Sequence, residues 1–597
     1  MTRATRTALY AASSYLPTAA AQETGLQIPF DVYLQDPLVS REDPKFGFDK
    51  DFQVPWEPGI SDGPTSARFA VVDFNGDTGL TAPMAKWSND CFVDPDGKVL
   101  DRKNADVLQF HQVNVWAILQ RALRFFEEGQ GLGRPIPYGF EGNRLIVVPH
   151  AGYGENAFYD RESKSLQFYY FDRDEGRVFT CLSTDIIHHE FGHAVLDGIR
   201  PYYYESSQAE TAAFHEFVGD LTAILIILRN NDFRRKLAET TGGNLSHAEH
   251  LSSIAEEFGR TVVDQPYLRS AKNTLKMSDV RDCQEPHQLS QVMTGAMFDI
   301  LLAISDHYIS KRGETARQAF WNAIQRMQRT AIQPLDLLPP VDVTFRDYAL
   351  AVLRAERISN PTDPHGYFEL MLQAFVNREI LTREDADEQR EPAYVYDRLR
   401  LSVFHDINAI SRSRAAAYRF LNDNRTDLLI PANQDVIVAD LYDANKQTRQ
   451  GQRLPRQVIL EYLWREDVEL EGAQFGKHAG AVTTMLCGGT LVFDENGNVL
   501  SWSQKPGTQS GPGERWKTSL AEGRERRERF LTNLSQRIAA GHVGAALGSS
   551  KGMLGSQIPP LTVREVDGTL RFQISPHMHL SGDHQHYHGK RRWEVSS

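Results

Sequence analysis

The stretch "TDIIHHEFGHAVLDGIRP", residues 184–201, is the part of the chain that most narrows what the protein can be. A serine and a threonine stand at its start, either of them a good helix N-cap, and Gly198 is a good stop signal, so the stretch predicts a helix. On that helix, His189 and His193 lie one turn apart and project from one face. Their spacing is that of two metal-binding imidazoles in the pattern H-E-x-x-H.

The other chemically important residue in this pattern is Glu190, next to the first histidine. Such a carboxylate lies beside the metal and accepts a proton from water. Composition alone produces the pattern in roughly one chain in twenty-five of this size, and a helix with a solvated polar face is the alternative. A third protein ligand is needed before the pattern predicts a catalytic metal site.

The candidate third ligand is Glu216, in the stretch "FHEFVGD" on the next predicted helix, residues 209–229. Asp220 follows one turn later on the same face, where it can orient a ligand histidine. The same helix continues into "LTAILIILR", which must be buried. Carboxylates at the start of so apolar a helix need partners, and a metal ion with its histidines supplies them.

Composition excludes several classes of function. The chain has 597 residues and a net charge of -13, which argues against nucleic acid or an anionic membrane as the main partner. Its four cysteines are far apart, so no disulfide framework is expected. No uninterrupted apolar run is long enough for a membrane span. The N-terminus resembles a secretory signal only weakly, because Ser13, Ser14 and Pro17 interrupt it, so a cytoplasmic location is favoured, with secretion as the alternative.

The order of the predicted elements indicates an α+β protein with several units. Residues 1–60 are rich in Pro, Asp and Gly and are predicted to form an irregular leader. Strands, including a hairpin around "DRESKS", and then helices form a unit over 61–381. A C-terminal α/β domain is expected over 394–560, with an Asn-Gly hairpin turn in "FDENGNV". Residues 561–597 are predicted to form a histidine-rich tail.

The two metal-site stretches, "DIIHHEFGHAVLDG" and then "HEFVGD", resemble the thermolysin family of zinc endopeptidases. Other stretches resemble segments of that family in the same order. "ENAFYD" is similar to its peptide-binding edge strand, "YLRS" to a segment with a substrate-binding arginine, and "DCQEPHQLS" to the segment that carries a catalytic histidine. Tyr204, fifteen residues after His189, stands where the family places a tyrosine near the scissile carbonyl.

The resemblance implies a two-lobed zincin fold over 61–381, with a mixed β N-terminal lobe, a mainly helical C-terminal lobe and then the C-terminal α/β extension. It implies a zinc-dependent endopeptidase that has one catalytic zinc ion and acts on a peptide or protein. The implied zinc ligands are His189, His193 and Glu216. Asp220 is implied as the carboxylate behind a ligand histidine.

The resemblance also implies the catalytic roles around the zinc ion. Glu190 is the general base, and His287 and Tyr204 donate hydrogen bonds to the oxyanion. Arg269 binds a carbonyl of the substrate, and Asp282 orients the catalytic histidine.

The substrate-binding residues follow from the same resemblance. Asn156 and the backbone of Ala157 are expected to hold an extended peptide by strand addition. Ile186, Phe179 and Leu268 are expected to line the pocket for the residue after the cleaved bond. Because all three are apolar, cleavage before a hydrophobic residue is predicted.

Particular residues argue against related zinc-peptidase families and against calcium sites. Ile199 stands where a metzincin has its third histidine. The chain also lacks the methionine pattern by which aminopeptidases of this class bind the substrate amine. The family's double calcium site is not expected, although Asp185 matches one of its ligands, because "ILIILRNNDFRRK" follows the third zinc ligand. "DFNGDTG", residues 73–79, lacks a closing glutamate and predicts a turn instead of a calcium loop.

Two functions stay open for the whole protein. The first is an active zinc endopeptidase, and the second is a catalytically inactive protein that binds peptides in the same cleft. The enzyme is favoured because every proposed metal ligand and catalytic residue is present. The C-terminal domain is expected to have a docking or a regulatory role, and Cys283 is interpreted as a neutral thiol.

Overall fold

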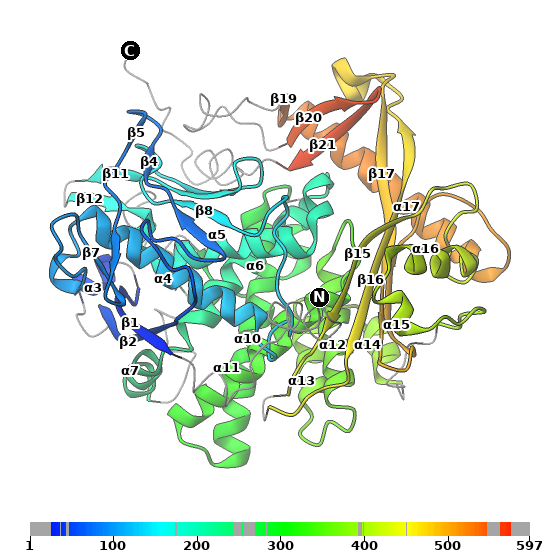
Figure 1. Ribbon diagram of the computed structural model, residues 1–597. Helices are drawn as coiled ribbons and strands as arrows, with labels where there is room; N and C mark the ends of the chain where they lie inside the picture. Colours follow the sequence, from blue (N-terminus) through cyan, green and yellow to red (C-terminus); the bar gives the residue numbers. More distant parts are fainter. Residues whose placement is uncertain are drawn as a thin grey trace, which may run out of the picture.

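A computed structural model gives the fold of the protein, which contains both helices and strands (Figure 1). The predicted α+β class is confirmed at this level. The structure describes residues 26–35, 37–42, 47–173, 176–242, 253–254, 269–281, 283–391, 397, 399–448, 451–545 and 561–574.

The N-terminal region is built on a four-stranded sheet. Its strand order is β3-β8-β10-β9, with the bounds Phe69–Val71, Leu145–Val148, Ser165–Phe168 and Ala157–Asp160. Strands β9 and β10 form the antiparallel hairpin that was predicted around "DRESKS", and β9 is an edge strand of the sheet. The long helix α4, Leu108–Glu127, contacts β3 on one side and α5 on another.

The prediction of an irregular leader is wrong for residues 27–55. Strands β1, Gln27–Tyr33, and β2, Phe48–Pro55, form an antiparallel pair that packs on α4. Alternate residues of β1 are buried, and the Phe30 ring meets Trp116 of α4 edge-on at 5.6 Å between ring centroids. This alternation has the period of a strand, but it is short and lies among prolines, which obscured it in the sequence.

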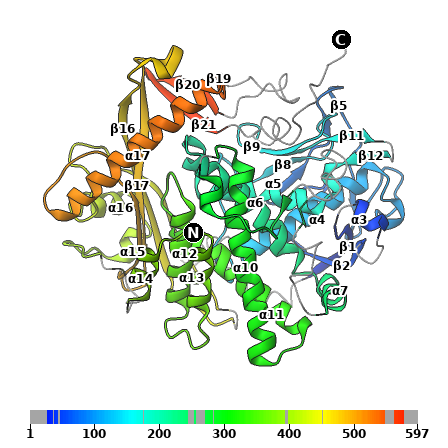
Figure 2. The ribbon, with the colours of Figure 1, turned by 180° about the vertical axis from the view of Figure 1, so that it is seen from behind.

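The centre of the molecule is helical (Figures 1 and 2). Helix α6 is buried on all sides and contacts both α5 and α10. Helices are present where the sequence predicts them between 184 and 381, but two further helices, over 231–241 and over 383–390 in the predicted boundary, were not predicted. Their bounds are α5 Thr184–Ile199, α6 Ala209–Ile227, α7 Asn231–Thr241, α10 Pro286–Arg312, α11 Ala316–Ile332, α12 Phe345–Ser359, α13 Tyr367–Asn377 and α14 Arg383–Arg390.

Within the described part of the chain, one helix, α10, is long and apolar enough to cross a membrane, and α6 with α7 would qualify as a bent pair. Two thirds of the apolar window of α10 is buried inside the protein. Core helices of globular proteins pass the same test of length and hydropathy, so these helices are weak evidence for a span.

The C-terminal region is a seven-stranded sheet with α17, Glu514–Ala539, lying across it (Figure 2). Phe530 and Leu534 of α17 are buried among the side chains of the sheet. The predicted Asn-Gly hairpin is present, with Gly497 at a positive φ of 85°. The strands are β15 Ile437–Ala444, β16 Gln457–Glu469, β17 Val482–Phe493, β18 Val499–Lys505, β19 Val543–Ala545, β20 Leu561–Val566 and β21 Thr569–Ile574.

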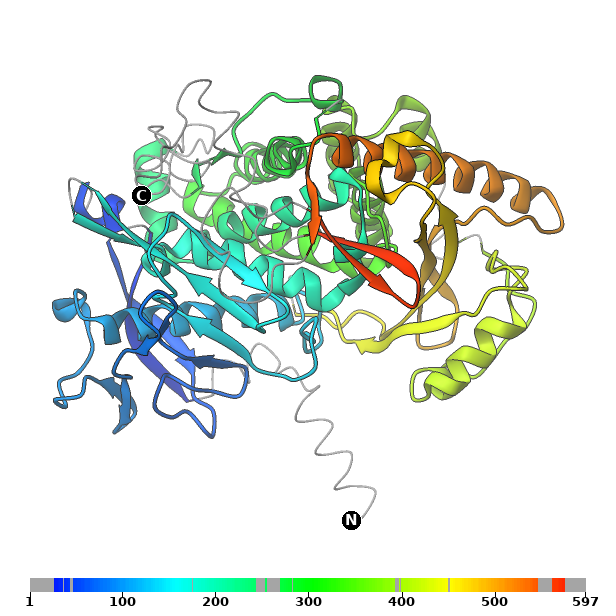
Figure 3. The same ribbon diagram turned by 90° about the horizontal axis from the view of Figure 1, so that it is seen from above.

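The predicted tail begins too early, because residues 561–574 form a hairpin that belongs to this sheet. Seen from above, the β20–β21 hairpin reaches toward segment η4, Pro201–Glu205, and β21 contacts that segment (Figure 3). Arg564 of β20 also pairs with Glu162, which follows the edge strand β9. The five histidines predicted for the tail, His577, His579, His584, His586 and His588, lie outside the described residues.

The C-terminal sheet and the helical centre share one hydrophobic core. Ala444, Ile459, Val492, Leu500 and Ile574 of the C-terminal sheet belong to the same buried cluster as the residues of α5, α6 and α10. The predicted boundary near 383–393 therefore separates two parts of the chain that fold against each other, and not two independently packed bodies.

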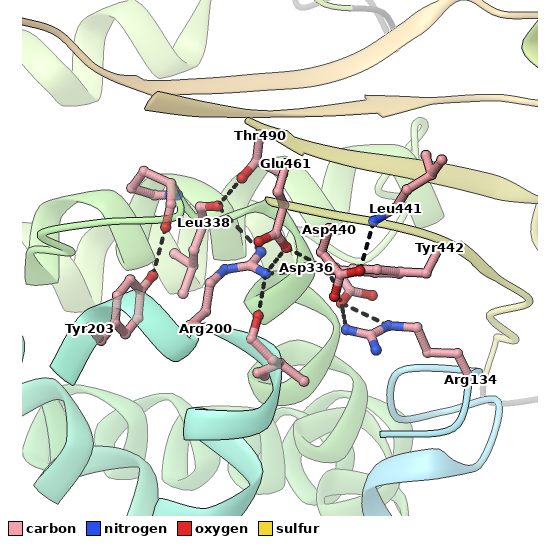
Figure 4. Close-up of polar contacts among 12 residues, drawn as sticks. Arg134, Arg200, Tyr203, Asp336, Leu338, Asp440, Leu441, Tyr442, Glu461 and Thr490 are labelled. Atoms are coloured by element: carbon pink, nitrogen blue, oxygen red, sulfur yellow. Dashed lines mark hydrogen bonds and ion pairs between the residues drawn. The ribbon is translucent and has the colours of Figure 1, made fainter. Parts of the chain in front are cut away.

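Buried ion pairs join the two parts (Figure 4). Arg200, the C-cap residue of α5, pairs with Glu461 of β16, and both side chains are at most 1% exposed. Asp336 lies at 2.9 Å from Arg134 and at 2.8 Å from Lys446. Because an isolated buried charge is costly, each of these groups requires the others to stay in place.

Aromatic and backbone contacts complete this interface. The Arg134 guanidinium lies 3.6 Å from the ring centre of Tyr442, whose hydroxyl donates to Glu461 at 2.9 Å. Thr490 of β17 donates to the carbonyl of Leu338 at 2.7 Å (Figure 4). The C-terminal sheet is thus fixed to the end of α5.

Replacing Asp336 by asparagine is expected to destabilise the protein by about 3–5 kcal/mol at pH 7, because two buried cations lose their shared carboxylate. Burial acts to raise the pKa of Asp336, but Arg134 and Lys446 lower it to about 2 from 3.8. The stabilisation linked to this shift, about 2 kcal/mol, is present above pH 4 and is lost as the pH falls toward 2. Urea unfolding of both proteins at several pH values measures the difference.

Asp443→Asn is the matched control, because Asp443 pairs with Arg456 while 40% of its side chain is exposed. Its substitution should cost less than about 1 kcal/mol. Equal effects of the two substitutions would contradict a special role for the buried network.

Candidate metal and catalytic site

Two glycines allow the helices of the site to approach closely. A Cβ atom on Gly192 of α5 would lie 2.9 Å from the Cα atom of Gly219 in α6, and one on Gly219 would lie 2.7 Å from the His189 ring. Real Cβ atoms do not approach so closely, so only glycine fits at either position. The close contact places the polar faces of α5 and α6 directly opposite each other.

Three of the predicted metal ligands converge across this contact. His189 Nε2 and His193 Nε2 are 3.1 Å apart. The carboxylate of Glu216 approaches them at 3.4 Å and 3.7 Å, respectively. Ligand atoms around a tetrahedral zinc ion are about 3.3 Å apart when the ion binds each at 2.0–2.1 Å. All three side chains are at most 5% exposed, so the donor set and its spacing fit a zinc ion.

Asp220 lies behind His189, as predicted for an acid that orients a ligand histidine. Its carboxylate lies 3.0 Å from His189 Nδ1. A carboxylate there holds the proton on Nδ1, so the lone pair of Nε2 faces His193 and Glu216. The arrangement is that of a metal-ligand histidine with an orienting acid behind it.

Glu190 is buried and belongs to the same cluster of potential ligand atoms as the two histidines, all within 4.8 Å of one another. It precedes the second histidine on α5 and is therefore available at the edge of the metal-binding face. His188, the remaining histidine of the stretch, is also buried, and burial lowers its pKa to about 3, so its ring is neutral.

His287 reaches the same cluster from α10. Its Nε2 atom lies 3.1 Å from Glu216, and its Nδ1 atom lies 2.6 Å from Glu285. Glu285 is also the N-cap of α10 and accepts hydrogen bonds from the first backbone N–H groups of that helix. Asp282, the predicted orienting acid, lies outside the described residues. Among the described residues, Glu285 is the acid that contacts His287 Nδ1.

Tyr204 lies beside the cluster, in the 3-10 segment η4 after α5. Burial, with a further contribution from Asp197, raises the pKa of Tyr204 well above its ordinary value, so the phenol remains a hydrogen-bond donor. Its ring packs against His215 at 4.9 Å, and His215 in turn lies 5.8 Å from the His193 ring. Burial lowers the pKa of His215 to about 3, which keeps this neighbour of the site uncharged.

A buried network that the sequence did not reveal ties the edge strand to α5. Asp197 of α5 accepts hydrogen bonds from the Tyr159 hydroxyl at 2.7 Å and from Arg161 Nε at 2.9 Å. The Arg161 guanidinium also lies over the Tyr204 ring, 4.8 Å from its centre. Sequence alone contained one signal, an aspartate four residues after His193 on the same helical face.

The predicted peptide-binding residues lie at the start of the edge strand. Asn156 is buried, its carbonyl accepts hydrogen bonds from the backbone of Tyr169 and the hydroxyl of Thr180, and its side-chain nitrogen has no partner within the described residues. Ala157 pairs with Phe168 on one side of β9. The opposite side of β9 carries no strand in the described part of the molecule.

The predicted apolar pocket is only partly described. Ile186 is half-buried in the first turn of α5. Phe179 instead packs its ring on His111 at 4.7 Å, between ring centroids. Leu268 lies outside the described residues, and of Arg269 the structure describes only the backbone, in the short strand β14, Arg269–Ser270.

The site thus brings together two imidazoles and one carboxylate as possible metal ligands. Glu190 lies in the same cluster, and His287 and Tyr204 are possible hydrogen-bond donors near it. Such a set can bind a divalent cation, activate water and stabilise a developing negative charge. No protein-family model matches the chain, and no curated protein matches it either.

Gly219→Ala is expected to push the His189 ring away from Asp220 and to lower zinc affinity about 10- to 100-fold. The same overpacking should destabilise the protein by about 1–3 kcal/mol. Zinc affinity, measured by competition with a chromogenic chelator, tests this together with urea unfolding. Ile226→Val, two turns further along α6, is the control, since it should cost about 1 kcal/mol and leave zinc affinity unchanged.

Proposed function

We propose that the protein is a zinc-dependent endopeptidase with a thermolysin-like, two-lobed catalytic unit. The convergence of His189, His193 and Glu216, with Asp220 behind the first histidine, is the observation that supports this most strongly. A polar surface helix does not account for it, because these side chains are buried and directed at one point.

Zinc held by these three ligands supplies Lewis-acid activation of water and of the peptide carbonyl. Glu190 accepts the proton of the attacking water and delivers it to the leaving amine. Tyr204 and His287 donate hydrogen bonds to the carbonyl oxygen as it gains negative charge. Glu285 holds the proton on His287 Nδ1 and stabilises the ring when it is positively charged.

Substrate would bind as an added strand, beginning at Asn156, along the side of β9 that carries no strand in the described part of the molecule. Backbone pairing of this kind gives affinity that is independent of the substrate sequence. Selectivity then comes from the pocket at the start of α5, where Ile186 offers an apolar surface.

The first test replaces the general base. Glu190→Gln keeps the size of the side chain but removes its ability to accept a proton, so hydrolysis of casein should fall about 10²- to 10⁴-fold while bound zinc is retained. Glu239→Gln, on the exposed side of α7, is the matched control and should be as active as the unsubstituted protein. Metal content is measured on the same samples.

An inactive, peptide-binding protein makes the opposite prediction. In that case the unsubstituted chain with its zinc site filled would be as inert as Glu190→Gln, and both would bind peptides equally well. That result would overturn the enzymatic assignment.

The second test addresses selectivity. With a peptide library, cleavage is expected before Leu, Phe or Ile, and Ile186→Arg should lower kcat/KM for those peptides at least about tenfold. For Ile186→Arg, peptides with an acidic residue after the cleaved bond should become better substrates relative to those with Leu, Phe or Ile there. A profile of the unsubstituted protein dominated by charged residues after the cut would contradict the pocket.

A further inference from the structure

A second cluster of metal-binding side chains lies away from α6 and α10. It consists of His111 in α4, His150 just after β8, and Cys181 in the 3-10 segment η3, Thr180–Leu182. Their exposed fractions are 2%, 4% and 0%, and their potential ligand atoms all lie within 4.8 Å of one another. The endopeptidase mechanism uses none of them.

The hydrogen bonds of the two histidines show which nitrogens carry protons. His111 Nε2 lies 3.1 Å from the carbonyl oxygen of Ala105, and His150 Nδ1 lies 2.9 Å from both carboxylate oxygens of Asp73. A carbonyl and a carboxylate only accept hydrogen bonds, so each of these nitrogens is protonated. The remaining nitrogens, Nδ1 of His111 and Nε2 of His150, then point lone pairs at each other across 2.9 Å.

Two facing lone pairs repel unless a positive charge lies between them, either a proton or a metal ion. The position of the third side chain favours the metal ion. Cys181 Sγ lies 3.9 Å from His150 Nε2. Around a tetrahedral zinc ion, two nitrogen ligands are about 3.3 Å apart and a nitrogen and a sulfur about 3.6 Å apart. The separations of 2.9 Å and 3.9 Å depart from these values by a few tenths of an ångström, and the third pair, Cys181 Sγ and His111, has ligand atoms within 4.8 Å of each other.

The charges of the cluster balance with a divalent cation. A doubly charged ion, the Cys181 thiolate and the Asp73 carboxylate sum to zero in a region where net charge is costly. A monovalent copper ion would leave one buried negative charge. Coordination to zinc deprotonates a thiol outright, so the thiolate charge is present when the ion is bound.

Further side chains hold one of the possible ligands, His150, in position. Asp73 holds His150 in the manner of an orienting carboxylate, and Gln112 donates to that carboxylate at 2.7 Å. Asp73 is the first residue of the "DFNGDTG" stretch, in which Asn75 accepts a hydrogen bond from the backbone of Asp77 to form the predicted turn. The first aspartate of the stretch therefore contacts the histidine cluster.

We propose that His111 Nδ1, His150 Nε2 and Cys181 Sγ bind a second zinc ion, which has a structural role and is separate from the ion of His189, His193 and Glu216. The cluster supplies three protein ligands among the described residues, which leaves one position of a tetrahedral ion for a further ligand. The ion joins α4, the end of β8 and the segment that leads directly into α5. It enters during folding, since the ligands are buried.

Cobalt distinguishes the two sites, because only the second contains sulfur. The full chain is produced in zinc-depleted, cobalt-supplemented medium, and the near-ultraviolet thiolate-to-cobalt charge-transfer absorption is recorded. The band is expected in the unsubstituted protein, in His193→Ala and in Cys487→Ser, and it should be absent in Cys181→Ser. Cys487 is a matched control because it is another fully buried thiol, 3.4 Å from the Arg526 guanidinium.

Absence of the band from the unsubstituted protein, or its persistence in Cys181→Ser, would overturn the proposal and leave a protonated histidine pair. If Cys181→Ser does not fold, X-ray absorption of the unsubstituted zinc protein decides the question, with a sulfur neighbour expected at about 2.3 Å. A zinc shell of nitrogen and oxygen alone excludes the second site. The sulfur signal is independent of proteolytic activity, so it does not depend on the proposed function.

Discussion

The contact between Gly192 and Gly219 is the constraint on which the site depends. Helix α6 is buried on all sides, so its acids cannot reach water and must be satisfied by a neighbouring element. A side chain at either glycine would hold α5 and α6 apart and separate Glu216 and Asp220 from the histidines. The close approach of the two helices therefore brings the buried acids of α6 within reach of the histidine nitrogens of α5.

The C-terminal region is best understood as part of the scaffold. Its sheet contributes side chains to the central core, and its buried Glu461 pairs with Arg200 at the end of α5. Its last hairpin contacts η4, which carries Tyr204, and Arg564 of that hairpin pairs with Glu162 beside the edge strand. A docking or regulatory role, if this region has one, would act through elements that already touch the site.

Local patterns predicted most helices and the convergence of His189, His193 and Glu216, because one helical turn determines which side chains share a face. They did not predict the contact of Glu285 with His287, since the sequence does not distinguish an acidic residue that caps a helix from one that also holds a histidine. The role of Asp197 was not predicted, because its partner Arg161 lies 36 residues away in the chain, just after strand β9. The β1–β2 pair and the β20–β21 hairpin were missed for a related reason: a short strand is recognised by its neighbour, and sequence does not supply the pairing.

Helix α5 is held at both ends by buried polar clusters, and this explains why its middle can carry reactive groups. Ser183 caps its start, two residues after Cys181, which lies in one cluster with His111 and His150. Arg200 joins the end of the helix to the C-terminal sheet. A shift of the C-terminal end of α5 would separate the buried Arg200–Glu461 pair, so side chains on a helix fixed in this way keep their relative positions. The stability of the outer clusters and the precision of the central one are thus properties of the same helix.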